Sequence, residues 1–282
     1  MLDRTFCHIR GIGPKAERKL WEDGFRTWQD ALDAPSLPLS PNKSDALRRN
    51  VAESVYHAEK GNAAFFANAL PTSESWRLFP AFRDRTAYID IETTGLGGPS
   101  DYITTIALYD GRDLRYYLHG ANLDDFSSDI KNYDLLISYN GKTFDVPFIR
   151  EYLGAPMEHA HIDLRYVLAS LGFKGGLKNC EKRLGLDRDE LEGVDGFFAV
   201  LLWYDFYNKG NRKALETLIA YNMTDVVNLE HLMVMAFNLK VTTTPFADSL
   251  RIPSPNPPEI PFKADSETVE RLRRKASFGR GW

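Results

Sequence analysis

The chain has 282 residues, 43% hydrophobic and 12% aromatic, which is enough to build one large domain or a domain with a smaller companion. A formal net charge of −4 excludes a globally basic nucleic-acid binder. It leaves room for a local basic groove around an acidic metal site.

Cysteine content and hydropathy exclude two further classes. Cys7 and Cys180 are far apart and form no C-x-x-C pattern, which argues against structural zinc and fits a reduced protein. The N-terminus has no signal-peptide core, and the longest apolar run, residues 197–204, is too short to span a bilayer. We therefore expect a cytoplasmic protein with no membrane partner.

Residues 1–70 predict a small helical domain. The turn Gly11-Ile12-Gly13 precedes a helix that begins near Pro14, and this arrangement resembles a helix-hairpin-helix element. Backbone N–H groups at such a turn can bind a nucleic-acid phosphate, and Lys15 adds positive charge beside it. An ordinary helical hairpin, in which the glycines only cap, is an equal alternative.

Composition divides the rest of the chain into three parts. Residues 71–84 are expected to be a linker, and residues 85–240 form the main domain. Residues 241–282 predict an extended tail, because prolines recur up to position 261, and its end is basic. A flexible phosphate contact is one interpretation of that end, and a solvated tail is the favoured one.

The main domain reads as a hairpin, a mixed sheet and then helices, which predicts an α/β fold. Asp110-Gly111 is a strong hairpin turn between two of the strands. The expected strands are residues 86–92, 102–109, 114–119 and 135–139, and the expected helices are residues 43–68, 124–132, 146–153, 164–171, 177–184, 197–208 and 213–239.

The first strand carries two acids in an apolar run. Asp90 and Glu92 are two residues apart, so their side chains point to the same face of a strand. Burying two like charges is costly unless a cation lies between them, and a hard divalent ion with oxygen ligands is the natural candidate. A solvated strand end is the plain alternative for an isolated D-x-E.

Three more residues of this chemistry follow. Asp145 stands where the fourth strand turns into a helix, and it could simply cap that helix. Tyr221 and Asp225 are four apart and share a helix face with Leu218 and Leu229, so this face points inward. An inward Asp needs a partner.

In chain order, D-x-E before Thr-Thr-Gly-Leu, N-x-x-x-F-D and Y-x-x-x-D resemble the three exonuclease motifs of the DEDD superfamily. These enzymes have a ribonuclease H-like fold and remove nucleotides from 3′ ends. The Tyr four before the last Asp resembles the DEDDy branch, because the DEDDh branch has His five before it, where position 220 is Ala. The chain is most similar to YprB-type proteins, relatives of the proofreading domain of family B DNA polymerases, over about residues 85–239.

The resemblance implies two Mg²⁺ or Mn²⁺ ions and a role for each residue. Asp90 would bridge both ions, while Glu92 and Asp225 would complete the site that holds the attacking water. Asp145 would support the second ion, and Tyr221 would orient the water.

The resemblance also implies contacts with the nucleic acid, from Thr93 and Leu96 after the first motif and from Asn140 and Phe144 in the second. Leu96 matches a position that packs against the terminal base. Phe144 is equally well explained as a core residue.

Two other segments have a weaker claim to function. His159 and His161 alternate as on a strand, but no partner cluster accompanies them, so a metal role is disfavoured. Lys174 to Lys178 lack the spacing of a P-loop, and the segment is better explained as the start of a helix that lines the substrate groove.

The leading hypothesis is a metal-dependent 3′-to-5′ exonuclease acting on single-stranded DNA or RNA ends, with DNA favoured. A structure-specific endonuclease is the alternative among enzymes, since ribonuclease H-like folds host these too. A nucleic-acid-binding module whose acids bind a structural ion is the alternative outside enzymes.

Overall fold

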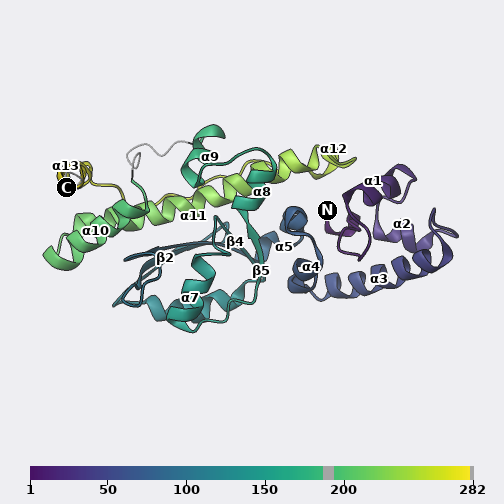
Figure 1. Cartoon of the computed structure of the whole chain (residues 1–282), viewed down its shortest axis with the longest axis horizontal. Coiled ribbons are helices and arrows are strands. Elements are labelled where there is room, and N and C mark those ends of the chain that lie inside the picture. Colours follow the sequence, from purple (N-terminus) through teal and green to yellow (C-terminus); the bar gives the residue numbers. More distant parts are fainter. Residues whose placement is uncertain (187–193, 280–282) are drawn as a thin grey trace.

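A mixed β-sheet lies at the centre of the protein, and the computed structural model describes residues 1–186 and 194–279 around it (Figure 1). The long helix α11 (Arg212–Val241) runs along one face of the sheet, and α7 (Asp145–Leu153) lies on the other. The N-terminal helices lie at one end of the long axis, and α13 (Ser266–Gly279) lies at the opposite end. The expected α/β architecture, a mixed sheet flanked by helices, is confirmed.

The five strands have the order β3-β2-β1-β4-β5. The central strand β1 pairs antiparallel with β2 and parallel with β4, while β2–β3 is an antiparallel pair and β4–β5 a parallel pair. Four of these strands were expected from the sequence, and β5 was not among them. The strands are β1 (Thr86–Thr93), β2 (Ile103–Tyr109), β3 (Leu114–Leu118), β4 (Leu135–Ser138) and β5 (Ala160–Asp163).

Alternation along β1 assigns its side chains to two separate cores. Ile89 and Ile91 are buried in the cluster that contains Val146 and Ile149 of α7. Tyr88 lies in the other cluster, with residues of α11. The acids of β1 therefore face α11.

Helices make up most of the remaining chain. The expected helix over 124–132 consists of three short pieces, and the one over 43–68 is divided at Gly61, which has φ 65°. The α-helices are α1 (Pro14–Glu22), α2 (Trp28–Asp33), α3 (Pro41–Glu59), α4 (Ala63–Ala69), α5 (Phe79–Phe82), α6 (Phe126–Asp129), α8 (Leu164–Ser170), α9 (Leu177–Arg183), α10 (Gly196–Lys209) and α12 (Ala247–Leu250); the 3₁₀ turns are η1 (Leu2–Arg4), η2 (Thr72–Leu78), η3 (Arg83–Arg85), η4 (Leu123–Asp125) and η5 (Ile130–Asn132).

The segment 71–84 differs from the linker that was expected. It folds into η2, α5 and the start of η3, and its tryptophan, leucine and phenylalanine side chains are buried. Arg77 is buried too, and its guanidinium lies 2.7 Å from Glu17 of α1 and 2.7 Å from Glu74. The hydrophobic cluster that begins at Met1 continues through this segment to Phe237 of α11. The N-terminal helices and the sheet domain therefore share one core.

The C-terminal tail also differs in part from the extended chain that was expected. Residues after Pro261 contain no proline, and Ser266–Gly279 form α13, while residues 280–282 lie outside the described part. Asp265 accepts a hydrogen bond from the Thr268 N–H at 2.9 Å at the helix start. Val269 and Leu272 are buried against α10 and α11. Burial of this apolar face therefore favours a packed helix, although basic residues on its other face are exposed.

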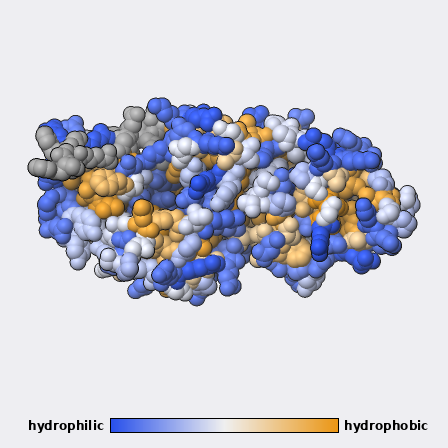
Figure 2. Space-filling model, viewed as in Figure 1, coloured by the Kyte–Doolittle hydropathy of each residue, from blue (hydrophilic) through white to orange (hydrophobic). Residues whose placement is uncertain are grey.

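Hydrophilic residues cover most of the face shown in Figure 2, and apolar residues gather on it only in limited areas. Within residues 1–186 and 194–279, no helix combines the length and the hydrophobicity needed to cross a membrane.

Arg271 of α13 binds the buried carboxylate of Asp205 on α10. Its Nη1 donates to Asp205 Oδ1 at 3.0 Å, and Nη2 donates to the other oxygen. Lys209 and Asn211 also donate to this carboxylate. These hydrogen bonds, that of Arg271 foremost, hold the pKa of Asp205 below its usual range.

We predict that Arg271→Ala lowers the free energy of unfolding by about 1–2 kcal/mol, because Asp205 stays buried with fewer donors. The loss should be present at neutral pH and shrink below about pH 4, where the unfolded carboxylate takes up a proton. Arg274→Ala on the same helix is the control, since its pair with Glu270 is largely exposed and contributes little. Equal urea denaturation midpoints for the two variants at neutral pH would contradict this role.

Candidate metal and nuclease site

Two carboxylates project from the end of β1 toward α11. Asp90 is paired in register with Ala107 of β2, and Glu92 with Thr105. A register shift follows between Glu92 and Thr93, where the strand ends. Asp90 is half-buried and Glu92 is buried. The expected orientation of both acids to one face is what the structure shows.

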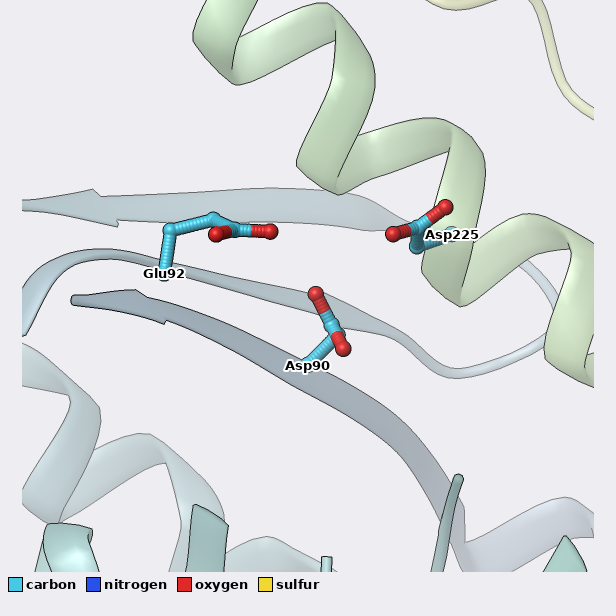
Figure 3. Close-up of side chains that lie close together, drawn as sticks. All are labelled: Asp90, Glu92 and Asp225. Atoms are coloured by element: carbon cyan, nitrogen blue, oxygen red, sulfur yellow. The ribbon is translucent and has the colours of Figure 1, made fainter. Parts of the chain in front are cut away.

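A third carboxylate comes from α11. Asp225 is buried and points toward the strand, as Figure 3 shows, so the three acids surround one space. One oxygen of each of Asp90, Glu92 and Asp225 lies within 4.8 Å of the others. Tyr221, one turn earlier on α11, is buried on the same side of the helix.

The environment of Asp90 disfavours its charged form. Burial raises its pKa well above the ordinary value, and the charges of Asp225, Glu92 and Asp145 raise it further. Asn222 of α11 opposes this effect, because its Nδ2 donates to Asp90 Oδ2 at 2.7 Å. Sequence analysis did not identify Asn222, although it directly follows Tyr221 in the third motif.

These residues fit a hard divalent cation. Three carboxylates from two elements offer oxygen ligands around one space, with Glu92 and Asp225 buried and Asp90 half-buried, and this is the donor set preferred by Mg²⁺ and Mn²⁺. Burial is the first cause of the raised pKa of Asp90, and the neighbouring negative charges that add to it are charges that a cation would neutralise.

Asp145 lies beside this group and is not one of its three members. It is the first residue of α7, and the N-cap position belongs to Phe144, so the capping interpretation is wrong. Its Oδ1 accepts the Ile91 N–H of β1 at 3.2 Å, which ties α7 to the strand between the two acids. Burial raises the pKa of Asp145 to about 7.

The loop after β1 presents Leu96 to solvent. Thr93 is buried, and its Oγ1 donates to the Gly95 carbonyl at 2.5 Å. Asp101 accepts the N–H groups of residues 97 and 98, and its carboxylate fills the space where a Cβ at Gly95 would stand. Leu96 is 92% exposed at the tip of this fixed loop.

In the second motif, Asn140 and Phe144 are both partly exposed. Asn140 has φ 68° and accepts a hydrogen bond from Thr143 at 2.9 Å. The Phe144 ring lies 5.8 Å from Phe148 and packs on the core beneath α7. Phe144 therefore belongs to the core edge and still presents part of its surface.

Lys178 reaches the site from α9, which begins at Leu177 as expected. Its Nζ lies 4.8 Å from the centroid of the Tyr221 ring. Sequence analysis assigned this segment to the groove but did not connect Lys178 to the tyrosine, because their contact joins two distant helices.

The remaining candidates are not members of this group of acids. Gly11 has φ 89° and Gly13 is extended. Both glycines are exposed, as is Lys15 at the start of α1. The turn is preceded by the single-turn η1 and not by the full helix of a helix-hairpin-helix element. His161 bonds to the Ser138 hydroxyl at 2.8 Å, and His159 to the Ile130 carbonyl at 3.0 Å.

The comparisons with known proteins agree with this geometry. The family model described as the RNase_H superfamily matches residues 87–237, more than half of the chain. The uncharacterized protein YprB of Bacillus subtilis is 30% identical over 171 aligned residues, which cover 52% of this chain. The chain spans 40% of the length of that relative.

A family B DNA polymerase from the archaeon Pyrobaculum calidifontis is a similar solved structure, with a TM-score of 0.35 and 14% sequence identity. The match covers 55% of this chain and 29% of the polymerase.

We predict that, without divalent ions, the protein loses stability as pH rises from about 5 to 8. The folded-state pKa values of Asp90 and Asp145 are raised above the unfolded values of about 4, so the folded state holds more protons in this range. Asp90→Asn removes one charge and should flatten this dependence.

Melting temperatures in EDTA at several pH values would test it. Mn²⁺ should stabilise the wild type more at pH 8 than at pH 6, because the ion replaces protons. Identical pH profiles of the wild type and Asp90→Asn would show that the cluster does not govern the effect.

Proposed function

The chain belongs to the RNase H superfamily, and we propose that it is a metal-dependent 3′-to-5′ exonuclease acting on single-stranded nucleic acid, with DNA favoured. The observation that carries the proposal is the convergence of Asp90, Glu92 and Asp225 around one space, with Tyr221 one turn from Asp225. A purely structural ion would explain the carboxylates but would not explain why Tyr221 lies beside them.

Two Mg²⁺ or Mn²⁺ ions held at such a site would lower the pKa of a bound water and would stabilise the charge on the leaving oxygen. Asp90, Glu92 and Asp225 would hold the ion that binds the nucleophilic water. Asp145 would support the second ion, and its bond to the Ile91 N–H fixes the direction of its carboxylate. Glu92, Asp145 and Asp225 are buried and Asp90 is half-buried, which limits water around the scissile phosphate.

Tyr221 orients the nucleophilic water through its hydroxyl. The phenol is buried and belongs to the helix that also carries Asp225, so the two side chains keep a fixed spacing. Lys178 lies over the Tyr221 ring at 4.8 Å and places a positive charge beside the site.

The terminal nucleotide binds between two rigid loops. Leu96 offers an exposed apolar side chain from the loop that also holds Thr93, and Asn140 and Phe144 offer polar and aromatic surface from the second motif. A site of this kind admits a free end more readily than the middle of a duplex. This is the reason to favour an exonuclease over a structure-specific endonuclease.

We predict that a 5′-labelled single-stranded oligonucleotide with Mg²⁺ or Mn²⁺ is shortened stepwise from its 3′ end, and that Asp90→Asn abolishes this ladder. Tyr221→Phe should slow hydrolysis about 10- to 1,000-fold while Mn²⁺ affinity stays near that of the wild type, because the phenol is not a ligand.

Each alternative outcome of this assay has a meaning. Internal cuts would favour an endonuclease, and binding without cleavage would favour a module with a structural ion. A large loss of Mn²⁺ affinity in Tyr221→Phe, measured by calorimetry, would show that the tyrosine has a different role.

We also propose that the turn at Gly11 and Gly13 grips a phosphate remote from the cleaved bond. A Cβ at either glycine would meet no atom within 4 Å, so the backbone there is open to a ligand. Lys15 is exposed beside the turn. Deleting residues 1–70 is unsuitable as a test, because Arg77 would lose its buried partner Glu17.

Lys15→Gln should instead weaken binding of single-stranded DNA and lower the slope of log affinity against log salt by about 1. Lys131→Gln, in the exposed turn before β4, is the control for a lost charge. Fluorescence anisotropy over a range of KCl concentrations measures both, and equal slopes for the two variants would count against a phosphate grip.

A further inference from the structure

The loop that joins β4 to α7 has a backbone conformation that requires support. Among the described residues, Asn140 is the one non-glycine residue with positive φ, at 68°. Asn tolerates this left-handed region better than most residues, but the conformation still costs energy and persists only where its surroundings fix it. Such an outlier beside a site is a reason to ask what it positions.

Asp163 supplies the support from the end of β5. The residue is 2% exposed, and its Oδ1 accepts the Asn140 N–H at 2.8 Å while Oδ2 accepts the Lys142 N–H at 3.1 Å. The same carboxylate accepts the Arg165 N–H at 3.0 Å. The buried Asp163 carboxylate therefore accepts hydrogen bonds from backbone N–H groups of the loop and of the first turn of α8.

The loop is also packed tightly against the acidic site. A Cβ at Gly141 would lie 2.2 Å from Ser138 Oγ and 3.4 Å from Asp145 Oδ2, so only glycine fits there. The Ser138 hydroxyl is in turn bonded to His161 at 2.8 Å. The loop therefore has little freedom between Asn140 and Asp145.

Arg165 is the side chain that this arrangement holds in place. It is exposed, and its Nη1 donates to the side-chain oxygen of Asn140. Its partner there is a neutral amide, and within residues 1–186 and 194–279 no carboxylate is paired with it. A guanidinium fixed by a neutral amide keeps its full charge, and most of its five N–H donors remain available.

We propose that Arg165 binds a backbone phosphate of the nucleic-acid strand beside the acidic site, and that Asp163 is the positioning residue that fixes the loop for it. This inference rests on the proposed function. Arginine matches the geometry of a phosphate with two parallel hydrogen bonds, which an amide-held guanidinium can form without losing its anchor. Its charge also offsets the repulsion between phosphates and the carboxylates.

The test measures binding in the Asp90→Asn background with Mg²⁺, so that the strand is not consumed. Arg165→Gln should weaken binding of a labelled single-stranded oligothymidylate about tenfold at low salt and lower the salt slope by about 1. Arg112→Gln, an 80% exposed arginine at the β2–β3 turn, is the control and should change neither quantity. In the otherwise wild-type chain, Arg165→Gln should raise KM and leave kcat nearly unchanged.

The positioning role of Asp163 has its own readout. Asp163→Asn should weaken binding, and Asp163→Asn with Arg165→Gln should bind no more weakly than Arg165→Gln, because both act on one contact. Additive losses would overturn the positioning role. If Asp163→Asn does not fold, Asn140→Gly tests the anchor of Arg165, since glycine keeps the positive φ. Asn140→Gly should then weaken binding less in the Arg165→Gln chain than in the chain that keeps Arg165, the remainder being the contact of Asn140 itself with the nucleotide, and equal losses would overturn the anchor.

The outcomes separate this inference from the function on which it rests. A cleavage ladder together with equal salt slopes for Arg165→Gln and Arg112→Gln would overturn the phosphate contact and leave the exonuclease standing. No binding of any oligonucleotide by the parent Asp90→Asn protein would overturn both.

Discussion

Repulsion among buried carboxylates at the end of β1 is the constraint on which the site depends. Asp90, Glu92 and Asp225 face one another across a distance at which three charges cannot all be buried without help. Asn222 gives Asp90 one hydrogen bond, which offsets only part of the cost. The remaining repulsion is relieved either when a carboxylate takes up a proton or when a cation binds. The raised pKa of Asp90 reflects the uptake of a proton. The same geometry favours the binding of a cation, because one divalent ion neutralises several charges together.

Such a cluster keeps its spacing only if α11 is held against the sheet. Near the N-terminal end of α11, the helix α13 packs on α10 and α11, and its Arg271 binds Asp205 of α10. Near its C-terminal end, the Phe237 ring lies 5.6 Å from Trp76 of the segment 71–84. Asp225 lies between these two supports. The segment 71–84 and α13 therefore stabilise the helix that carries one side of the site, and each shares a hydrophobic core with it.

The sequence predicted what depends on local periodicity. Alternation placed Asp90 and Glu92 on one strand face, and helical spacing placed Tyr221 one turn from Asp225, as the structure shows. What failed depends on partners remote in the chain. Alternation at His159 and His161 was noted, but the four residues of β5 were too few to be counted as a strand. The buried role of Asp163 follows from backbone donors more than twenty residues away.

Misjudged segments show the same limit. Prolines up to position 261 suggested an extended tail, yet α13 forms because Val269 and Leu272 find a core to bury against. The segment 71–84 was expected to be a linker because a proline and serines open it. Its tryptophan, leucine and phenylalanines pack between two regions that composition alone could not join.

The net charge of −4 and nucleic-acid binding are compatible once charge is considered locally. Phosphates approaching Asp90 and Asp225 are repelled unless cations intervene, so a bound metal addresses only the scissile phosphate. Neighbouring phosphates need positive side chains that are fixed in place, because a mobile side chain loses entropy on binding. Arg165 on its amide anchor and Lys178 over the Tyr221 ring meet that requirement at the edge of the acidic centre. Under the proposed function, affinity for the strand would come from a few immobilised charges and would not require a basic surface.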